Sequence, residues 1–210
     1  MKTEEKKDFD KEAAQWDVNP GRVKLANEVA DAMIRELKPA PDMDALDFGC
    51  GTGLVTLRLQ PYVKTIMGAD SSMGMLAVLR EKVEKQGINN VRTQFIDFEK
   101  GGEVSGKFHL IVSSMTLHHV PDTASLLRRW HELLHPGGWV CFADLDAEDG
   151  SFHGDNTGVF HLGFNRERLK KLLHGTGFRE VRCATATTMT REVEGKGTRD
   201  FPVFLMAGRK

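Results

Sequence analysis

Features that mark several specialised protein classes are scarce or missing in this sequence. Its 210 residues include only three cysteines, and no two have the Cys-x-x-Cys spacing of zinc or redox sites. No apolar run approaches the roughly 18 residues of a membrane span, and the first residues are charged where a signal peptide would be apolar. We therefore expect a cytoplasmic protein with free thiols and no membrane span.

An excess of charge of either sign is also missing. The chain has 29 Lys and Arg residues against 30 Asp and Glu residues, which gives a formal net charge of -1. Proteins that bind the phosphate backbone of nucleic acids usually carry a basic excess, so we expect no nucleic-acid partner. The length and the hydrophobic share of 40% suit one compact domain with a sizeable core.

Strand-like and helix-like segments alternate along the chain, which predicts a doubly wound α/β fold. Strands are predicted at residues 44–48, 64–70, 91–96, 107–113, 139–143, from about 178 and at 201–207. Helices are predicted at residues 22–37, 54–59, 71–86, 122–134 and 166–174. The return through residues 195–197 is too short for a parallel crossover, so the last strand of this seven-stranded sheet should be antiparallel. We expect a sharp turn at residues 135–138 and a long connection at 144–163, a length that often marks functional loops.

A glycine-rich turn, Gly49-Cys50-Gly51-Thr52-Gly53, follows the first predicted strand directly. Glycines in such a turn allow unusual backbone angles and let a ligand press against the main chain, although tight turns also produce them without a ligand. Asp70 ends the next predicted strand, where a carboxylate can accept hydrogen bonds from two ribose hydroxyls. An Asp at a strand end is by itself typical of a helix cap. Its coincidence with the glycine turn favours a nucleoside-containing ligand.

A third strand end carries the pair Asp97-Phe98. Asp97 could accept a hydrogen bond from an adenine amino group, and Phe98 could pack on the ring. The alternative is that Asp97 is a turn residue and Phe98 a core residue. Because three successive strands end with such groups at one edge of the sheet, we favour binding of an adenosine moiety.

These segments together resemble the class I S-adenosylmethionine-dependent methyltransferases, in particular their small-molecule branch. The resemblance rests on residues 46–53, 68–72, 97–98, 108–120 and 134–140, and residues 9–37 with Trp16-Asp17 are similar to the lid segment of that branch. It implies a Rossmann-like sheet, S-adenosylmethionine as cofactor, a small-molecule methyl acceptor, an N-terminal helical lid at 1–40 and a cofactor-binding domain at 41–210. The cofactor-binding residues that it implies are Arg22, Asp47, Gly49, Cys50, Gly51, Gly53, Asp70, Ser71, Met75, Asp97, Phe98 and Ser113.

The chemistry of methyl transfer gives several of these residues a role. The methionine carboxylate of the cofactor favours amide N–H groups, helix N-termini or Arg22, and its ammonium favours carbonyls near Gly49 and Ser113. A general base is needed only if the acceptor loses a proton early, and we name His118 and His153 for that role. The alternative is a structural role for His118 and a place in a solvated loop for His153. The spacing offers no second ligand pair, so no metal is expected.

Two other functions use similar patterns. A nicotinamide-dependent dehydrogenase also has a glycine turn and an acid after its second strand, but the spacing here is G-x-G-x-G in place of G-x-G-x-x-G. A binding protein that kept the cofactor site without transfer activity is the second alternative. We further expect Trp16, the N-terminal helix and residues 144–163 to cover the methyl group and to become ordered when the cofactor binds. The sequence carries no pattern that identifies the acceptor atom or the oligomeric state.

Overall fold

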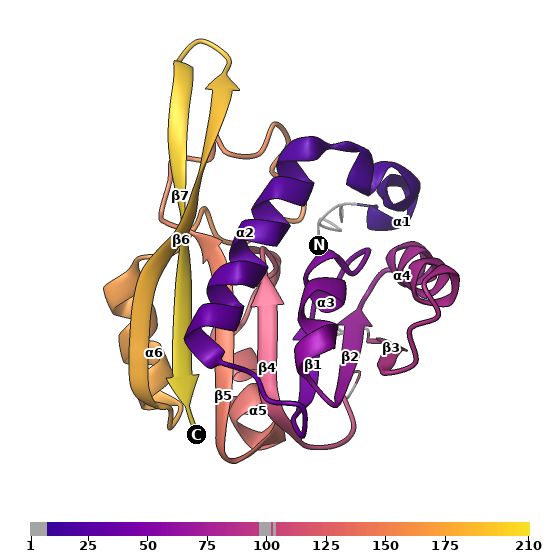
Figure 1. Ribbon diagram of the computed structural model, residues 1–210. Coiled ribbons are helices and arrows are strands. Elements are labelled where there is room, and N and C mark those ends of the chain that lie inside the picture. The colour runs from indigo at the N-terminus through magenta and orange to yellow at the C-terminus, as the bar shows by residue number, and fades with distance from the viewer. Residues whose placement is uncertain (1–7, 97–101, 103) are drawn as a thin grey trace.

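The computed structural model describes residues 8–96, 102 and 104–210. Within these residues the chain forms a seven-stranded sheet in the order β3-β2-β1-β4-β5-β7-β6 (Figure 1). The strands are β1 (Asp44–Phe48), β2 (Thr65–Asp70), β3 (Val91–Phe95), β4 (Phe108–Ser114), β5 (Leu134–Leu145), β6 (Arg179–Val193) and β7 (Gly197–Arg209). The first five are parallel, and β7 runs antiparallel to both β5 and β6. The predicted fold class, including the antiparallel last strand, is confirmed.

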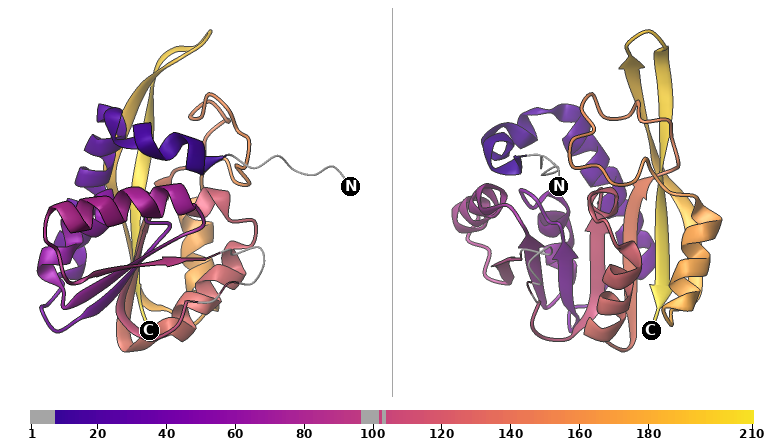
Figure 2. Two further views of the ribbon diagram at one scale, coloured as in Figure 1. Left: turned by 90° about the vertical axis from the view of Figure 1, so that its right-hand side faces the viewer. Right: turned by 180° about the vertical axis from the view of Figure 1, so that it is seen from behind.

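Helices cover both faces of the sheet, as Figures 1 and 2 show from opposite sides. One face carries α2 (Pro20–Leu37), α3 (Leu54–Leu59) and α4 (Met73–Lys85), and the other carries α5 (Thr123–Leu133) and α6 (Arg166–Gly175). The short helices are α1 (Phe9–Glu12), η1 (Ala13–Val18), η2 (Gln60–Tyr62) and η3 (Leu117–His119). Successive strand residues point to opposite faces, so β1 contributes Ala45 to the core under α2, and Leu46 and Phe48 to the core under α5.

The helices begin where polar residues can cap them. The Oγ of Ser72 accepts a hydrogen bond from the N–H of Met75 at 3.1 Å, which starts α4. Asn19 caps α2 in the same way, with Pro20 as its first residue, and Asp122 caps α5. These caps place the observed helix bounds within about two residues of the predicted ones, because cap chemistry is local to the sequence.

Two predicted boundaries were wrong. The predicted turn at residues 135–138 lies inside β5, which begins at Leu134 and bends there through Gly137 at φ 80° and a register shift opposite β4. The final hairpin is also longer than predicted. β7 pairs with β5 only from Val203 onward, so its first residues pair with β6 alone and the hairpin projects beyond the sheet (Figure 1).

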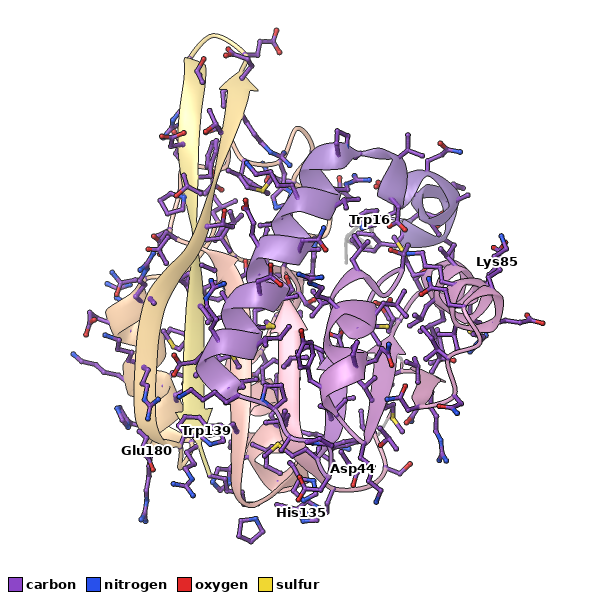
Figure 3. All side chains as sticks on the ribbon, in the orientation of Figure 1. Trp16, Asp44, Lys85, His135, Trp139 and Glu180 are labelled. Carbon is purple, nitrogen blue, oxygen red and sulfur yellow. The ribbon has the colours of Figure 1, made fainter. Side chains whose placement is uncertain are left out.

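The fold brings the carboxyl ends of β1, β2 and β4 to one edge, and α1 and η1 lie across it (Figure 1). Figure 3 labels Trp16 at this end and Asp44 and His135 at the opposite end of the sheet. This edge is where doubly wound sheets bind ligands. None of the helices in the described part of the chain has the length and apolar character needed to cross a membrane.

Candidate functional site

A cavity of about 220 Å³ opens at this edge, between the strand ends and the N-terminal segment (residues 8–37). Most of the residues predicted to bind the cofactor line it: Arg22, Asp47, Gly49, Cys50, Gly51, Asp70, Ser71 and Met75. They come from α2, the end of β1, the glycine turn (residues 49–53), the end of β2 and the start of α4. The structure therefore brings the separate sequence motifs to one cavity.

Two other predicted residues, Gly53 and Ser113, do not line the cavity. Gly53 is the N-cap of α3, where an added Cβ would collide with Leu79, so this glycine serves packing. The Oγ of buried Ser113 donates to the carbonyl of Phe48 at 2.8 Å and links β4 to β1 without lining the cavity. Asp97 and Phe98 lie outside the described residues.

Asp47 is a buried carboxylate at the cavity wall, with 1% of its surface exposed. Its Oδ2 accepts a hydrogen bond from the Oγ1 of Thr56 at 2.5 Å, whereas its Oδ1 is buried and has no hydrogen-bond partner among the residues that the structure describes. Burial raises the pKa of Asp47 to about 7; the Thr56 bond opposes this rise and the charge of Asp70 adds to it. A buried, unsatisfied carboxylate oxygen beside a cavity favours a positively charged ligand group.

Asp70 organises the glycine turn. Its Oδ2 accepts from the N–H of Gly51 at 2.8 Å, and its Oδ1 accepts from the N–H of Ser72 at 2.9 Å. Burial raises the pKa of Asp70, and these backbone bonds oppose the rise. Each carboxylate oxygen has a further lone pair that a ligand hydroxyl could use.

Gly51 exposes its backbone to the cavity. It lines the cavity with φ 53°, and a Cβ added at this position would meet no atom within 4 Å. Any side chain there would be strained and would occupy the open space. The turn thus presents backbone without a side chain to the cavity, as the predicted close approach of a ligand requires.

Two aspartates of the N-terminal segment bond it to the glycine turn and to α4. Asp10 accepts hydrogen bonds from the Oγ of Ser72 at 2.5 Å and from the N–H of Gly74 at 2.7 Å, at the start of α4. Asp17 accepts from the Oγ1 of Thr52 at 2.6 Å and forms an ion pair with Lys82. Both contacts hold α1 and η1 over the cavity.

Aromatic side chains of the N-terminal segment form the roof. Phe9, Trp16 and Arg22 all line the cavity. The guanidinium of Arg22 lies 3.8 Å from the ring centre of Trp16, and its Nη2 lies 3.1 Å from Oε2 of Glu12. Arg22, predicted to pair with a ligand carboxylate, is therefore at the cavity with Glu12 as its carboxylate partner in this structure.

The predicted bases His118 and His153 do not line the cavity, whereas His119 does. His118 is 1% exposed, and its Nδ1 lies 2.7 Å from Oδ1 of Asp144. The Nδ1 of His119 lies 2.7 Å from the carbonyl oxygen of Gly158. A carbonyl only accepts, so Nδ1 carries the hydrogen, and in the neutral ring Nε2 then holds the lone pair.

Sequence reasoning singled out the Leu117-His118-His119 run but chose the wrong imidazole for the cavity wall. Both rings belong to η3, where they stack at 4.1 Å between ring centres while facing different surroundings. The predicted strand also ended one residue early. β4 extends to Ser114, and Ser114, Met115 and Thr116 line the cavity in the place expected for Ser113. In the described ranges, no group of three or more His, Cys, Asp or Glu residues is arranged to hold a metal ion.

Comparison with known proteins identifies relatives of the central part of the chain. Residues 45–138 match the model of a family described as a methyltransferase domain. An uncharacterized methyltransferase of Schizosaccharomyces pombe is 37% identical over 135 residues, which cover 58% of this chain and 48% of that protein. A ubiquinone biosynthesis O-methyltransferase of Pseudomonas aeruginosa is 29% identical over 136 residues, which cover 65% of this chain and 55% of that protein. The chain thus spans about half the length of the curated relatives it matches.

The fold has counterparts among solved structures. The crystal structure of an S-adenosylmethionine-dependent methyltransferase from Aquifex aeolicus superposes with a TM-score of 0.70, covering 97% of this chain and 99% of that one. Their sequences are 19% identical, so this likeness concerns the fold. It extends over the N-terminal segment and the final hairpin as well as the region that the family model matches.

Proposed function

We infer that this chain, which belongs to the class I S-adenosylmethionine-dependent methyltransferases, transfers a methyl group from that cofactor to a small-molecule acceptor. The observation that carries the proposal is the Oδ1 of buried Asp47, which has no partner within the described part of the chain and lies beside the bare backbone of Gly51 in one cavity. The similarity to a ubiquinone biosynthesis O-methyltransferase supports a small organic molecule as acceptor.

The residues present fit this cofactor. Asp47 would face its ammonium group, Asp70 would accept hydrogen bonds from the ribose hydroxyls, and Gly51 would pack its main chain against the ligand. Arg22 would hold the methionine carboxylate in exchange for Glu12. When bound, the cofactor supplies a methyl group on a positively charged sulfonium, which a nucleophile in line with the carbon–sulfur bond can accept.

The residues of this chain would align the acceptor, exclude water and hold a proton. Phe9 and Trp16 would exclude water from above. We assign proton acceptance to Nε2 of His119, because this ring lines the cavity and Gly158 fixes its tautomer. His118, stacked on His119 and bonded to Asp144, would act by positioning that ring, and His153 lies 6.1 Å from it between ring centres.

Calorimetry on the purified chain tests the cofactor assignment. S-adenosylmethionine and S-adenosylhomocysteine should both bind saturably, and NAD should not bind. Saturable NAD binding without a response to S-adenosylhomocysteine would overturn the proposal in favour of a dehydrogenase. Formation of S-adenosylhomocysteine in the presence of candidate acceptors then separates a transferase from a protein that only binds the cofactor.

A further inference from the structure

Aromatic and cationic side chains from four segments form a continuous series of neighbours that begins at the cavity roof, and we call this series the rim. Its members are Arg22, Trp16, Phe9, His119, His153, Phe152 and Arg191. They come from the N-terminal segment, η3, the connecting loop (residues 146–165) and the projecting part of β6. The rim therefore joins parts of the chain that are far apart in sequence.

The first half of the rim belongs to the cavity itself. Arg22 lies 3.8 Å from the ring centre of Trp16, and the rings of Trp16 and Phe9 have centres 5.9 Å apart. Phe9 then meets the edge of His119, at 5.3 Å between ring centres. These four residues all line the cavity, so this half of the rim faces the place where the methyl group would lie.

The second half continues from His119 into the connecting loop and the hairpin. His119 and His153 have ring centres 6.1 Å apart, and His153 and Phe152 lie at 4.8 Å. The guanidinium of Arg191 sits 4.1 Å from the ring centre of Phe152 and donates a hydrogen bond to the carbonyl of Phe152 at 2.7 Å. Arg191 thus ends the rim on the hairpin side.

Arg191 differs from Arg199 and Arg166 in how its charge is paired. Arg199, its partner across the hairpin, pairs with Asp149 at 2.7 Å, and Arg166 pairs with Asp146 at 2.6 Å. No acidic side chain in the described part of the chain pairs with half-buried Arg191. Burial lowers the pKa of Arg191, and the positive charge of Arg22 lowers it further. A guanidinium in such a place gains stability from an anion.

We propose that Arg191 binds a carboxylate or phosphate group of the methyl acceptor and so turns the nucleophile of that acceptor toward His119, while Arg22 stays with the cofactor. This inference rests on the proposed function and names the chemical class of its substrate. The guanidinium of Arg191 has five N–H donors, and its hydrogen bond to the carbonyl of Phe152 leaves donors for a bidentate contact with an anion. The aromatic members of the rim would enclose the carbon frame of the acceptor.

The test uses the full chain saturated with S-adenosylhomocysteine and pairs of probes that differ in charge. The anionic probes are 4-hydroxybenzoate and phenyl phosphate, and the neutral probe is 4-hydroxybenzamide. Titrations monitored by calorimetry or by ligand-observed NMR should show that at least one anionic probe binds more tightly than the amide. The two anions also distinguish the sources, because a carboxylate acceptor favours the first and a phosphate acceptor the second.

Variants then assign that preference to Arg191. Arg191→Met keeps an apolar stem over Phe152 and removes the charge, so it should weaken the anionic probe by about ten- to a hundredfold and leave the amide unchanged. Arg191→Lys should restore part of the affinity. Arg179→Met, an exposed residue at the other end of β6, is the matched control and should behave like the parent protein.

Two results would overturn the proposal. One is that no anionic probe binds the parent protein better than the amide, and the other is that Arg191→Met binds the anion as the parent does. The affinity for S-adenosylhomocysteine reports separately on the proposed function and on correct folding, and it should be equal in all variants. A parent protein that does not bind S-adenosylhomocysteine would instead refute the proposed function.

Discussion

The cofactor side of the cavity and the rim differ in how the chain builds them. The cofactor side comes from residues 47–75, which are close in sequence and present backbone atoms and two carboxylates, one buried and one partly buried. The rim comes from the N-terminal segment, η3, the connecting loop and the hairpin, and its side chains meet only after the whole sheet has formed. Local sequence therefore builds the strand-end side of the cavity, whereas long-range packing builds the rim.

The two regions also differ in how much free energy is lost when one partner of a polar contact is removed. Asp47 is buried and Asp70 is partly buried, so removing a partner there leaves desolvated groups unsatisfied. The ion pairs that hold the connecting loop to the hairpin, such as Asp149 with Lys196 and Arg199, lie at the surface. Exposed pairs of this kind contribute little to stability. The variants below test whether this contrast holds, from the largest expected effect to the smallest.

Asp70→Ala should weaken the binding of S-adenosylmethionine by roughly 2 to 4 kcal/mol, because ribose hydroxyls and the N–H of Gly51 both lose their acceptor in a partly dry pocket. The fold should survive, since the carboxylate lies at a strand end outside the core. Calorimetry and thermal unfolding measure the two effects. Asp31→Ala, which removes an acid paired with Arg58 on α2 and α3, is the control and should bind normally. Normal binding by Asp70→Ala would show that the ribose assignment is wrong.

The charge of Asp47 should make cofactor binding depend on pH. Its folded-state pKa of about 7 exceeds the ordinary value of 3.8, so the protonated form is favoured in the folded protein without cofactor. Between these two pKa values, each rise of one pH unit should cost the free protein up to about 1.4 kcal/mol of folding stability.

Ionisation of Asp47 should have the opposite effect on cofactor binding, because affinity should rise with pH whereas folding stability falls. The ammonium of the cofactor needs the ionised carboxylate, so affinity for S-adenosylhomocysteine should rise up to about tenfold per pH unit below pH 7 and level off above it. Calorimetry from pH 5.5 to 8 measures this slope. Asp47→Asn should remove most of it from both stability and binding. An equal slope in the variant would exclude Asp47 as its source.

Asp10→Ala should loosen the N-terminal segment, because the start of α4 loses the carboxylate that accepts from Ser72 and Gly74. A cap contact of this kind is worth about 1 kcal/mol, so hydrogen exchange in residues 9–18 should become about fivefold faster when S-adenosylhomocysteine is bound. Lys11→Ala removes an exposed charge of the same segment, which pairs with Asp8, and keeps the backbone N–H that Asp8 caps, so it is the matched control. Equal exchange in the two variants would contradict a specific latch at Asp10.

Among these variants, Asp149→Asn should change hydrogen exchange and cofactor affinity the least. Hydrogen bonding from Ser151, then from Lys196 and Arg199, lowers the pKa of Asp149, and the amide would lose the charge that these cations contact. We expect slightly faster hydrogen exchange in the connecting loop at low salt, no difference at 1 M salt where the charges are screened, and unchanged affinity for S-adenosylhomocysteine. A large loss of cofactor affinity would mean that the loop supports the cofactor side as well.

The accuracy of the sequence predictions follows the same division between local and long-range structure. The bounds of β1 and α3 were predicted correctly, because each depends on neighbouring residues. The start of β5 at Leu134 was missed, because a turn-forming Pro-Gly-Gly run is held in the sheet by its partner strands. Tertiary pairing outweighed local propensity there.

The candidate site shows the same limit. Which of two adjacent histidines faces the cavity depends on Asp144 and Gly158, which hold His118 and His119 from distant parts of the chain. No local pattern marks Arg191 either, since its environment is made by Phe152 and by Arg22. Motifs therefore pointed to most of the residues that line the cavity, whereas the surroundings of His119 and Arg191 could be read only from the folded arrangement.

Ser72 connects several of these contacts in a single residue. Its N–H donates to Asp70, its hydroxyl donates to Asp10, and the same hydroxyl accepts from the N–H of Met75. If the cofactor binds as proposed, Ser72 would link cofactor binding to the position of the N-terminal segment, and thermodynamic linkage would make this coupling reciprocal. Any change that closes the segment more firmly should also lengthen the residence time of the spent cofactor. Turnover would then be limited by the opening of α1 and η1, and the chemical step would be too fast to set the rate.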